Sequence, residues 1–311
     1  MFLVILGHTH LCEQQIVVKQ AIYSFHMPLF FFLSGLLCKS TLSVRSLLKD
    51  ARFLLLPYLF YGLLAIAAGV LFSGRLSAGD IAAGLGSLIT GLDAAIGPIW
   101  FLPALFVCKQ AGVLLLSVRQ RSKAAYCLLA MLTPLPVCFL KDVNLPFFSD
   151  SALCGLPFFL LGSESARHLL GRSLPGKATL VCTGAFGAVL TVLIARENGM
   201  SALATCSYGA SVPLYYAAAL TGIVSATALC VAVQRPSRFV STTASGNIVT
   251  LGTHGIILTL IHRIYARASG MDYAVYGLPA ALLFTVLTYV GCYCVIVLAG
   301  RYCPRPFGLR G

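Results

Sequence analysis

The chain has 311 residues, of which 59% are hydrophobic and only 10% are charged. A soluble domain typically contains about 45–50% apolar and about 25% charged residues. This composition excludes a disordered chain, a coiled coil and a small disulfide scaffold, and it argues against a soluble globular enzyme. The remaining class is all-α: a polytopic transmembrane helical bundle, whose length allows about ten spans of a ~30 Å hydrocarbon core.

Ten apolar runs follow one another with no soluble segment of domain size between them, so we expect one transmembrane domain over residues 1–311. The first run lacks the basic flank and cleavage site of a signal peptide, and we interpret it as an incomplete first span. Segment 76–97 is too weakly apolar for a span and is expected to be re-entrant or to lie in the interface. The ten runs cover residues 1–10, 20–38, 53–73, 99–117, 124–140, 151–163, 178–195, 209–233, 247–266 and 274–299.

The formal net charge is +13, from 22 basic and 9 acidic residues. In a soluble protein this excess would suggest nucleic acid, but here the basic residues lie in short loops, where they set membrane orientation. We therefore expect a lipid bilayer and no nucleic acid as partner. One set of alternate loops holds more basic residues than the other, which predicts that both termini are cytoplasmic, and the short loops suit a bacterial inner (plasma) membrane. The richer set is Lys39, Arg45, Lys49, Arg52, Arg119, Arg121, Lys123, Arg167, Arg172, Lys177, Arg235, Arg238, Arg301, Arg305 and Arg310, and the sparser set is Lys19, Arg75, Lys141, Arg196, Arg263 and Arg267.

The sequence contains 12 cysteines but no CxxC pair. Most of them lie inside the apolar runs, where a free thiol behaves as a small hydrophobic side chain. We therefore expect neither a zinc site nor any other metal site, and no framework of disulfides.

Two histidines stand near the same predicted membrane face. His8 ends the first run and His26 lies early in the second, with a short outward-facing loop between them. Adjacent antiparallel helices can bring these side chains into one cavity. Because the unperturbed pKa of histidine lies near neutrality, the pair suits the removal of a proton from a hydroxyl group. The alternative interpretation is that each imidazole only bonds to a neighbouring helix.

Three further polar residues lie close to the second and third runs. Lys49 and Arg52 stand at the predicted inner end of the third run, where basic side chains bind an anionic headgroup or a nucleotide phosphate. The alternative is that they only signal orientation. Ser34 is a candidate nucleophile or, more simply, a packing hydroxyl, and the Ser34–Gly35 pair permits close helix approach.

Trp100, His254 and His262 are candidates for the lining of the cavity. Trp100 begins a span, where a membrane-belt anchor is typical. His254 and His262 share one run and point to roughly the same side of a helix, but their spacing is not a metal motif. The sequence does not fix their distance from His8. The chain contains no P-loop, GxGxxG, HExxH or GxSxG motif, so soluble nucleotide folds and the common hydrolases gain no support.

In their order and spacing, segments 3–8, 25–35 and 52–58 resemble integral-membrane acyltransferase family 3. Segment 99–106 is similar to the fucose 4-O-acetylase-like branch, and two later segments, 157–162 and 245–262, resemble the looser parts of the family. The resemblance implies about ten transmembrane helices. It also implies an O-acetyltransferase that moves an acetyl (acyl) group from acyl-CoA to a hydroxyl of a cell-surface or lipid-linked sugar. Acetyl-CoA would be a co-substrate, with no bound cofactor.

The resemblance also assigns individual residues. His8 matches the essential histidine of the family's first helix, Ser34 and Gly35 match its second motif, and Arg52 matches the basic residue ahead of the Leu-Pro-Tyr segment. Family members carry a further basic residue and an aspartate nearer the N-terminus. This chain has no positions for them because it starts at Met1, so we expect an N-terminally truncated first span.

The resulting hypothesis is general-base catalysis. His8, assisted by His26, would remove the proton of the acceptor hydroxyl, whose oxygen attacks the thioester. Lys49 and Arg52 would hold the phosphates of the donor from the cytoplasmic side. A covalent acyl-enzyme on Ser34 or on a histidine is a variant of this route. Two other classes stay open: a transporter or flippase of a glycan precursor, although no inverted repeat is visible, and a non-catalytic membrane protein.

Overall fold

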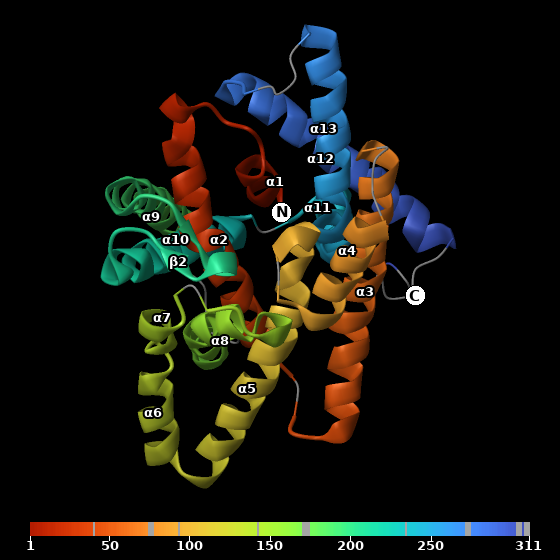
Figure 1. Ribbon diagram of the computed structural model, residues 1–311. Coiled ribbons are helices and arrows are strands. Elements are labelled where there is room, and N and C mark those ends of the chain that lie inside the picture. Colours follow the sequence, from red (N-terminus) through yellow and green to blue (C-terminus); the bar gives the residue numbers. More distant parts are fainter. Residues whose placement is uncertain are drawn as a thin grey trace. The chain divides into compact units, whose positions relative to one another are not determined.

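The computed structural model describes residues 1–39, 41–73, 78–92, 94–141, 143–169, 175–233, 235–270, 275–302 and 307. Helices dominate these residues, and one pair of two-residue strands is the only sheet among them (Figure 1). The expected all-α class is therefore confirmed. Four residues that enter the orientation count lie outside the described residues: Arg75, Arg172, Arg305 and Arg310.

The chain divides into two compact units, and each is described by itself. The first unit comprises Met1–Lys19, Arg52–Leu102 and Arg235–Gly311, and the second comprises Gln20–Ala51 and Pro103–Gln234. Three of the four boundaries between the units fall inside helices: α2 (Ile16–Leu36), α3 (Val44–Ser73) and α5 (Phe101–Arg121).

In the first unit, α13 packs against both α1 and α12. The ring of Phe2 in α1 meets Tyr289 in α13 edge to face at 6.0 Å. Helix α12 also approaches α3 closely. Gly252 of α12 faces the Tyr61 ring of α3, and a Cβ added at Gly252 would lie 2.2 Å from that ring. Besides most of α3, the elements of this unit are α1 (Phe2–Gly7), η1 (Glu13–Gln15), α4 (Ala78–Thr90), η2 (Ala94–Trp100), α11 (Arg238–Ser245), α12 (Asn247–Ser269) and α13 (Leu278–Tyr302).

In the second unit, α9 and α10 lie side by side (Figure 1). Small and hydroxyl residues allow this contact: Ser225 Oγ donates to the Gly184 carbonyl at 2.7 Å, and the Thr191 and Thr221 hydroxyls bond at 2.9 Å. Besides most of α2 and α5, the elements are α6 (Lys123–Leu132), α7 (Pro136–Phe139), η3 (Pro146–Phe148), α8 (Ser149–Leu169), α9 (Lys177–Asn198), β1 (Ser201–Ala202), η4 (Leu203–Thr205), β2 (Ser207–Tyr208) and α10 (Val212–Ala232).

Seven helices of the described residues are long and apolar enough to cross a membrane: α2, α3, α5, α9, α10, α12 and α13. Each of the ten predicted runs contains a helix, but three of these helices fall short. Helix α1 has 6 residues, Pro134 and Pro136 interrupt run 124–140, and α8 carries Asp150 and Glu164 near its ends. The expected count of about ten is therefore corrected to seven by length and composition.

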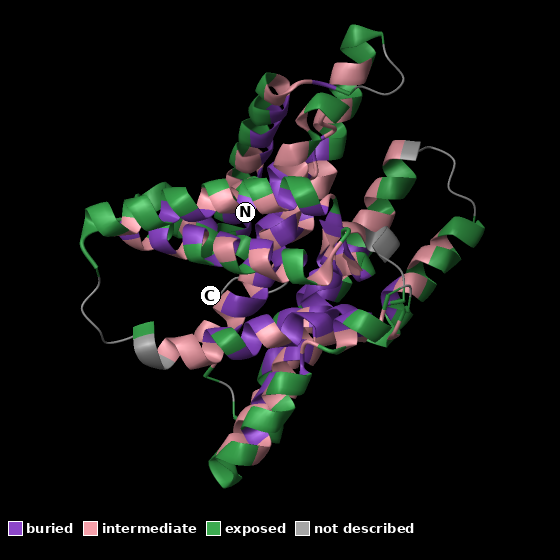
Figure 2. Ribbon diagram, turned by 90° about the vertical axis from the view of Figure 1, so that its left-hand side faces the viewer, coloured by how far each residue is buried: buried purple, intermediate pink, exposed green. Residues whose placement is uncertain are grey.

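Many large apolar residues are exposed, and exposed stretches occur along most of the helices (Figure 2). Leu71 is 80% exposed, Phe139 74% and Val44 72%. In water such an extensive apolar surface would be a liability, whereas lipid tails solvate it. The exposed apolar surface therefore fits a multi-pass membrane protein.

Segment 76–97, which was expected to be too weakly apolar for a span and to be re-entrant or interfacial, is helical in part. Helix α4 within it has 13 residues, which is shorter than a crossing requires. It packs back on α3 through the Tyr58 hydroxyl, which donates to the Leu88 carbonyl at 2.9 Å. The expectation that this segment is not a span is confirmed.

Candidate functional site

The position of His8 is set by the end of α1 and by the chain that follows it. His8 caps the C-terminus of α1, and an extended segment runs on from it. Backbone bonds tie this segment to the chain before α13: the Tyr276 N–H donates to the His10 carbonyl at 3.1 Å, and the Cys12 N–H donates to the Tyr276 carbonyl at 3.2 Å. His8 is thus held at the junction of α1 and the approach to α13.

His8 lies beside His254 of α12, with ring centroids 5.4 Å apart. His254 is fully buried, and its Nδ1 lies 2.8 Å from the Thr250 carbonyl. A carbonyl only accepts hydrogen bonds, so Nδ1 carries the proton and Nε2 is an unprotonated acceptor. This buried Nε2 has no hydrogen-bond partner among the described residues. The sequence proposed His254 only as cavity lining, whereas the structure makes it the ring neighbour of His8.

A second pair of imidazoles lies further along the same two segments. The rings of His10 and His262 are 4.2 Å apart between centroids, and the Tyr276 hydroxyl contacts His262 Nε2. The backbone N–H of His10 also donates to this hydroxyl at 3.1 Å. Sequence analysis singled out His262 but missed His10 and Tyr276. A signal was available in the sequence: the first run ends with two histidines, His8 and His10, and run 247–266 carries two more, His254 and His262.

His26 belongs to the second unit, so its partnership with His8 stays a prediction. It is buried in α2, its Nδ1 lies 2.8 Å from the Ile22 carbonyl, and its ring meets Tyr23 at 5.0 Å. The same argument as for His254 places the proton on Nδ1 and leaves Nε2 unprotonated. Both buried histidines therefore present the tautomer that a base requires.

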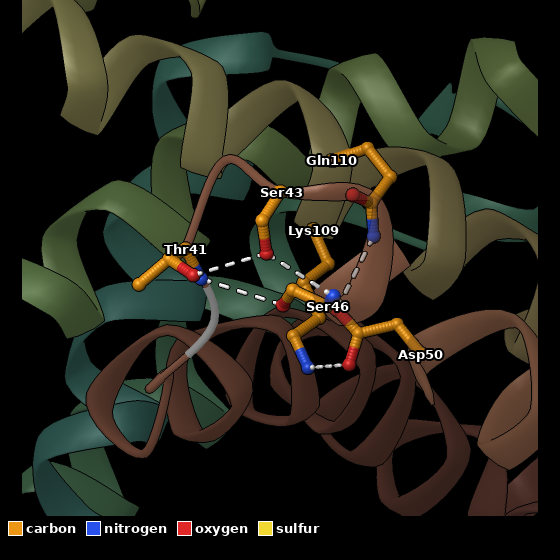
Figure 3. Close-up of polar contacts among 6 residues, drawn as sticks. All are labelled: Thr41, Ser43, Ser46, Asp50, Lys109 and Gln110. Atoms are coloured by element: carbon orange, nitrogen blue, oxygen red, sulfur yellow. Dashed lines mark hydrogen bonds and ion pairs between the residues drawn. The ribbon is translucent and has the colours of Figure 1, made fainter. Parts of the chain in front are cut away.

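The two predicted donor-binding residues, Lys49 and Arg52, are both exposed on α3. Between them, Asp50 is buried and bonded to α5: Lys109 Nζ donates to one carboxylate oxygen at 2.7 Å and Gln110 Nε2 to the other at 3.3 Å (Figure 3). Because Lys109 neutralises Asp50, the intervening carboxylate does not cancel the charges of the two exposed cations. Sequence analysis missed this buried ion pair.

A groove of about 680 Å³ lies between segment 41–47 and α5. Ser43 begins α3 by accepting the Ser46 N–H at 3.2 Å, and Ser46 Oγ accepts the Thr41 N–H at 3.4 Å (Figure 3). These bonds fix one wall of the groove. Its lining is mainly apolar with a few polar groups, and includes Thr41, Ser43, Leu47, Phe106, Gln110 and Leu114.

The remaining candidates occupy packing positions. Ser34 is half-buried on α2, and its neighbour Gly35 faces the backbone of Phe159 in α8. The predicted close helix approach at Gly35 is therefore confirmed. Trp100 is 7% exposed and meets Phe101 edge to face at 6.2 Å. Such burial is unlike a lipid-facing belt anchor.

The family comparison covers almost the whole chain. The family model of an acyltransferase domain, acyltransferase family 3, matches residues 1–300. No curated protein and no solved structure matches significantly. The match includes both histidine pairs, the buried ion pair and all seven helices that are long enough to cross a membrane. The chain therefore belongs to acyltransferase family 3 and is a membrane acyltransferase by family.

Proposed function

We propose that this chain is an O-acetyltransferase that moves an acetyl (acyl) group from acyl-CoA to a hydroxyl of a cell-surface or lipid-linked sugar. We further propose that it lies in a bacterial inner membrane and that it belongs to the fucose 4-O-acetylase-like branch of the family. The observation that carries the proposal is the His8–His254 pair, in which one imidazole has a ring neighbour with an unprotonated, unpartnered nitrogen. Such a pair supports proton transfer from an alcohol.

His8 acts as the general base in this proposal. In the reaction, His8 turns one ring N–H towards His254 Nε2, which has no hydrogen-bond partner in the part of the chain that the structure describes, and this keeps the other His8 nitrogen unprotonated. That nitrogen takes the proton of the acceptor hydroxyl while the hydroxyl oxygen attacks the thioester carbonyl. The carbon–sulfur bond then breaks, and the proton passes to the CoA thiolate. The overall reaction, alcohol plus acyl-CoA to ester plus CoA thiol, needs no further proton donor or acceptor.

The other histidines have supporting roles. His26, in the same tautomer as His254, assists the base. His262, which the Tyr276 hydroxyl and the His10 ring hold in place, lines the approach of the acceptor together with Trp100. A ring stack and a hydroxyl network suit a substrate that offers both hydroxyl groups and apolar ring faces.

The donor enters from the predicted cytoplasmic side. Lys49 and Arg52 contact the phosphates of the CoA nucleotide, because exposed cations on one helix recognise a phosphate by charge-assisted hydrogen bonds. The groove between segment 41–47 and α5 takes the less polar arm of the donor. Its amide and hydroxyl groups, from Gln110, Ser43 and Thr41, match the amides of that arm.

The test uses membranes, labelled acetyl-CoA and a sugar acceptor. We expect His8→Ala to lower the rate of label transfer by at least ~10²-fold, because the general base is lost. Cys12→Ala is the matched control: it changes the same segment and keeps the backbone bond to Tyr276, so transfer should stay near that of the parent. Membrane content and thermal unfolding of both variants are compared with those of the parent.

Two outcomes would overturn the proposal. If His8→Ala transfers label at the rate of the parent, His8 is not the general base. No transfer by the parent, combined with counterflow of intact sugar across vesicles, would replace the enzyme with the transporter.

A further inference from the structure

A closed polar cluster lies at one end of α8, beneath the loop that joins α9 to α10. Asp150 and Cys154 come from successive turns of α8, and Cys206 and Tyr208 come from the loop. All four are buried, with Cys154 at 0% and Cys206 at 1% exposure. Tyr215 of α10 closes the cluster, with its ring 5.1 Å from that of Tyr208. The described function uses none of these residues.

The two thiols are neighbours. Cys154 and Cys206 share a side-chain hydrogen bond, and the Cys206 thiol also donates to Asp150 Oδ2 at 3.9 Å. The Cys206 backbone stands at φ 48°, in the left-handed region that residues other than glycine rarely adopt. The loop therefore holds Cys206 against α8 in a specific and strained conformation.

Several hydrogen bonds keep the loop in this position. Ser151 Oγ donates to the Leu203 carbonyl at 3.0 Å and so ties α8 to the loop. The Asn198 side chain donates to the Tyr208 carbonyl and accepts the Ser211 N–H, both at 2.8 Å. The approach of Cys206 to Cys154 is thus built into the fold and does not depend on a mobile side chain.

The cluster contains an unsatisfied polar atom. Asp150 Oδ1 is buried without a hydrogen-bond partner among the described residues, whereas the Tyr208 side chain bonds to the two thiols. Unpaired buried polar atoms are uncommon and call for a chemical reason. No group of three or more metal-binding side chains suited to a metal ion is found in the part of the chain that the structure describes. What the cluster does offer is two adjacent thiols.

We propose that Cys154 and Cys206 form a disulfide during folding, which fastens the α9–α10 loop to α8. This assignment departs from the expectation, drawn from the sequence, that the cysteines are only apolar filler. It does not rest on the proposed function. The orientation predicted from the basic residues puts this loop on the outer side of the membrane, where disulfides form and persist.

The chemistry is thiol–disulfide exchange with an oxidant of the disulfide oxidoreductase class. The Cys206 thiolate attacks the disulfide of the oxidant, forms a mixed disulfide and releases one oxidant thiolate. The Cys154 thiolate then attacks Cys206 Sγ and releases the second oxidant thiolate. The two cysteines lose two electrons and two protons, and the oxidant becomes a dithiol. The hydrogen bond with Cys154 lowers the pKa of Cys206, which favours it as the attacking thiolate.

The test is mass spectrometry of the full chain. Membranes are prepared without reductant, the protein is denatured in N-ethylmaleimide, and its peptides are analysed before and after reduction. We expect a linked pair of peptides that contains Cys154 and Cys206, with both thiols alkylated only after reduction. The exposed Cys182 and Cys230 should be alkylated without reduction. Alkylation of both Cys154 and Cys206 before reduction, or a link to any other cysteine, would overturn the proposal.

Two variants check the pairing. Cys206→Ser should leave Cys154 open to alkylation in the denatured chain without reductant. Cys292→Ser is the matched control, because Cys292 is also buried but lies in the first unit, and it should leave the linked peptides unchanged. If Cys206→Ser does not accumulate, the analysis of the parent chain still decides the question.

Discussion

The Asp50–Lys109 pair is a charged contact inside an otherwise apolar part of the second unit. Asp50 is 5% exposed, and its two carboxylate oxygens are bonded to Lys109 and Gln110 (Figure 3). A buried carboxylate is tolerated only while a partner compensates its charge. The pair therefore matters more through the cost of breaking it than through the net stabilisation that it provides.

This argument yields a prediction for Lys109→Met, which shortens the side chain by one atom, keeps its unbranched shape and removes its charge. We expect the free energy of unfolding to fall by about 3–5 kcal/mol, because the buried Asp50 carboxylate loses the positive charge of Lys109. Thermal unfolding in detergent measures the effect. The double variant Asp50→Asn, Lys109→Met should recover most of the loss.

A control comes from the more exposed pair of Arg119 and Glu164, whose glutamate side chain is 37% exposed. Arg119→Met should cost at most about 1 kcal/mol, since solvent screens such pairs. A stability of Lys109→Met equal to that of the parent would show that the Asp50 charge is compensated elsewhere.

Single residues also show how far the sequence leads towards the site. The chemistry of histidine singled out His8, His26, His254 and His262 from their type and their position in apolar runs. The neighbour of His8 could not be identified in this way, because α1 and α12 meet only through the packing of the folded chain. The tautomers of His26 and His254 depend on bonds to backbone carbonyls, which become visible only in coordinates.

Among the helices, α2 and α8 make an unusually close contact through two glycines. A Cβ on Gly35 would lie 1.8 Å from the Phe159 carbonyl oxygen, and one on Gly162 would lie 1.9 Å from the Phe32 carbonyl oxygen. Each helix thus presents a glycine to the backbone of the other. Such small residues let membrane helices pack by backbone contact.

We therefore predict that Gly35→Ala and Gly162→Ala each lower the free energy of unfolding by about 1–3 kcal/mol, because α2 and α8 must move apart. Thermal unfolding in detergent is again the measurement. Gly86→Ala is the matched control: Gly86 lies in α4 with nothing within 4 Å of its Cβ position. It should be neutral or stabilise the protein by up to about 1 kcal/mol, since alanine favours a helix. Equal effects of all three substitutions would refute the close contact.

The helical elements were largely predictable, because long apolar runs need internal hydrogen bonding in lipid. Each of the ten runs contains a helix, yet the sequence overestimated how many qualify as spans. Run 124–140 illustrates the reason: Pro134 and Pro136 end α6 and begin α7, so a run of sufficient apolar length becomes two short helices. Segment 78–90 forms the helix α4, where the sequence predicted only a segment too weakly apolar for a span, re-entrant or interfacial.

For the molecule as a whole, the orientation in the membrane determines where each substrate enters. The proposed mechanism needs Lys49 on the donor side, and the proposed disulfide needs the α9–α10 loop on the oxidising side. Both follow from one count of basic residues in alternate loops. A test of the orientation therefore bears on both proposals at once, without depending on activity.

Helix α9 offers this test, because its 22 residues are long enough to span the membrane and exposed residues, Lys177 and Met200, stand at its start and just beyond its end. We predict that Met200→Cys, just beyond its C-terminus, reacts with a membrane-impermeant maleimide in intact cells with a permeable outer envelope. Lys177→Cys, at its first residue, should react only after the inner membrane is opened. The labelling of the parent chain is subtracted from that of each variant. The reverse pattern would put Lys49 and Arg52 on the outer side, away from cytoplasmic acyl-CoA, and would leave the Cys154–Cys206 pair in a reducing compartment.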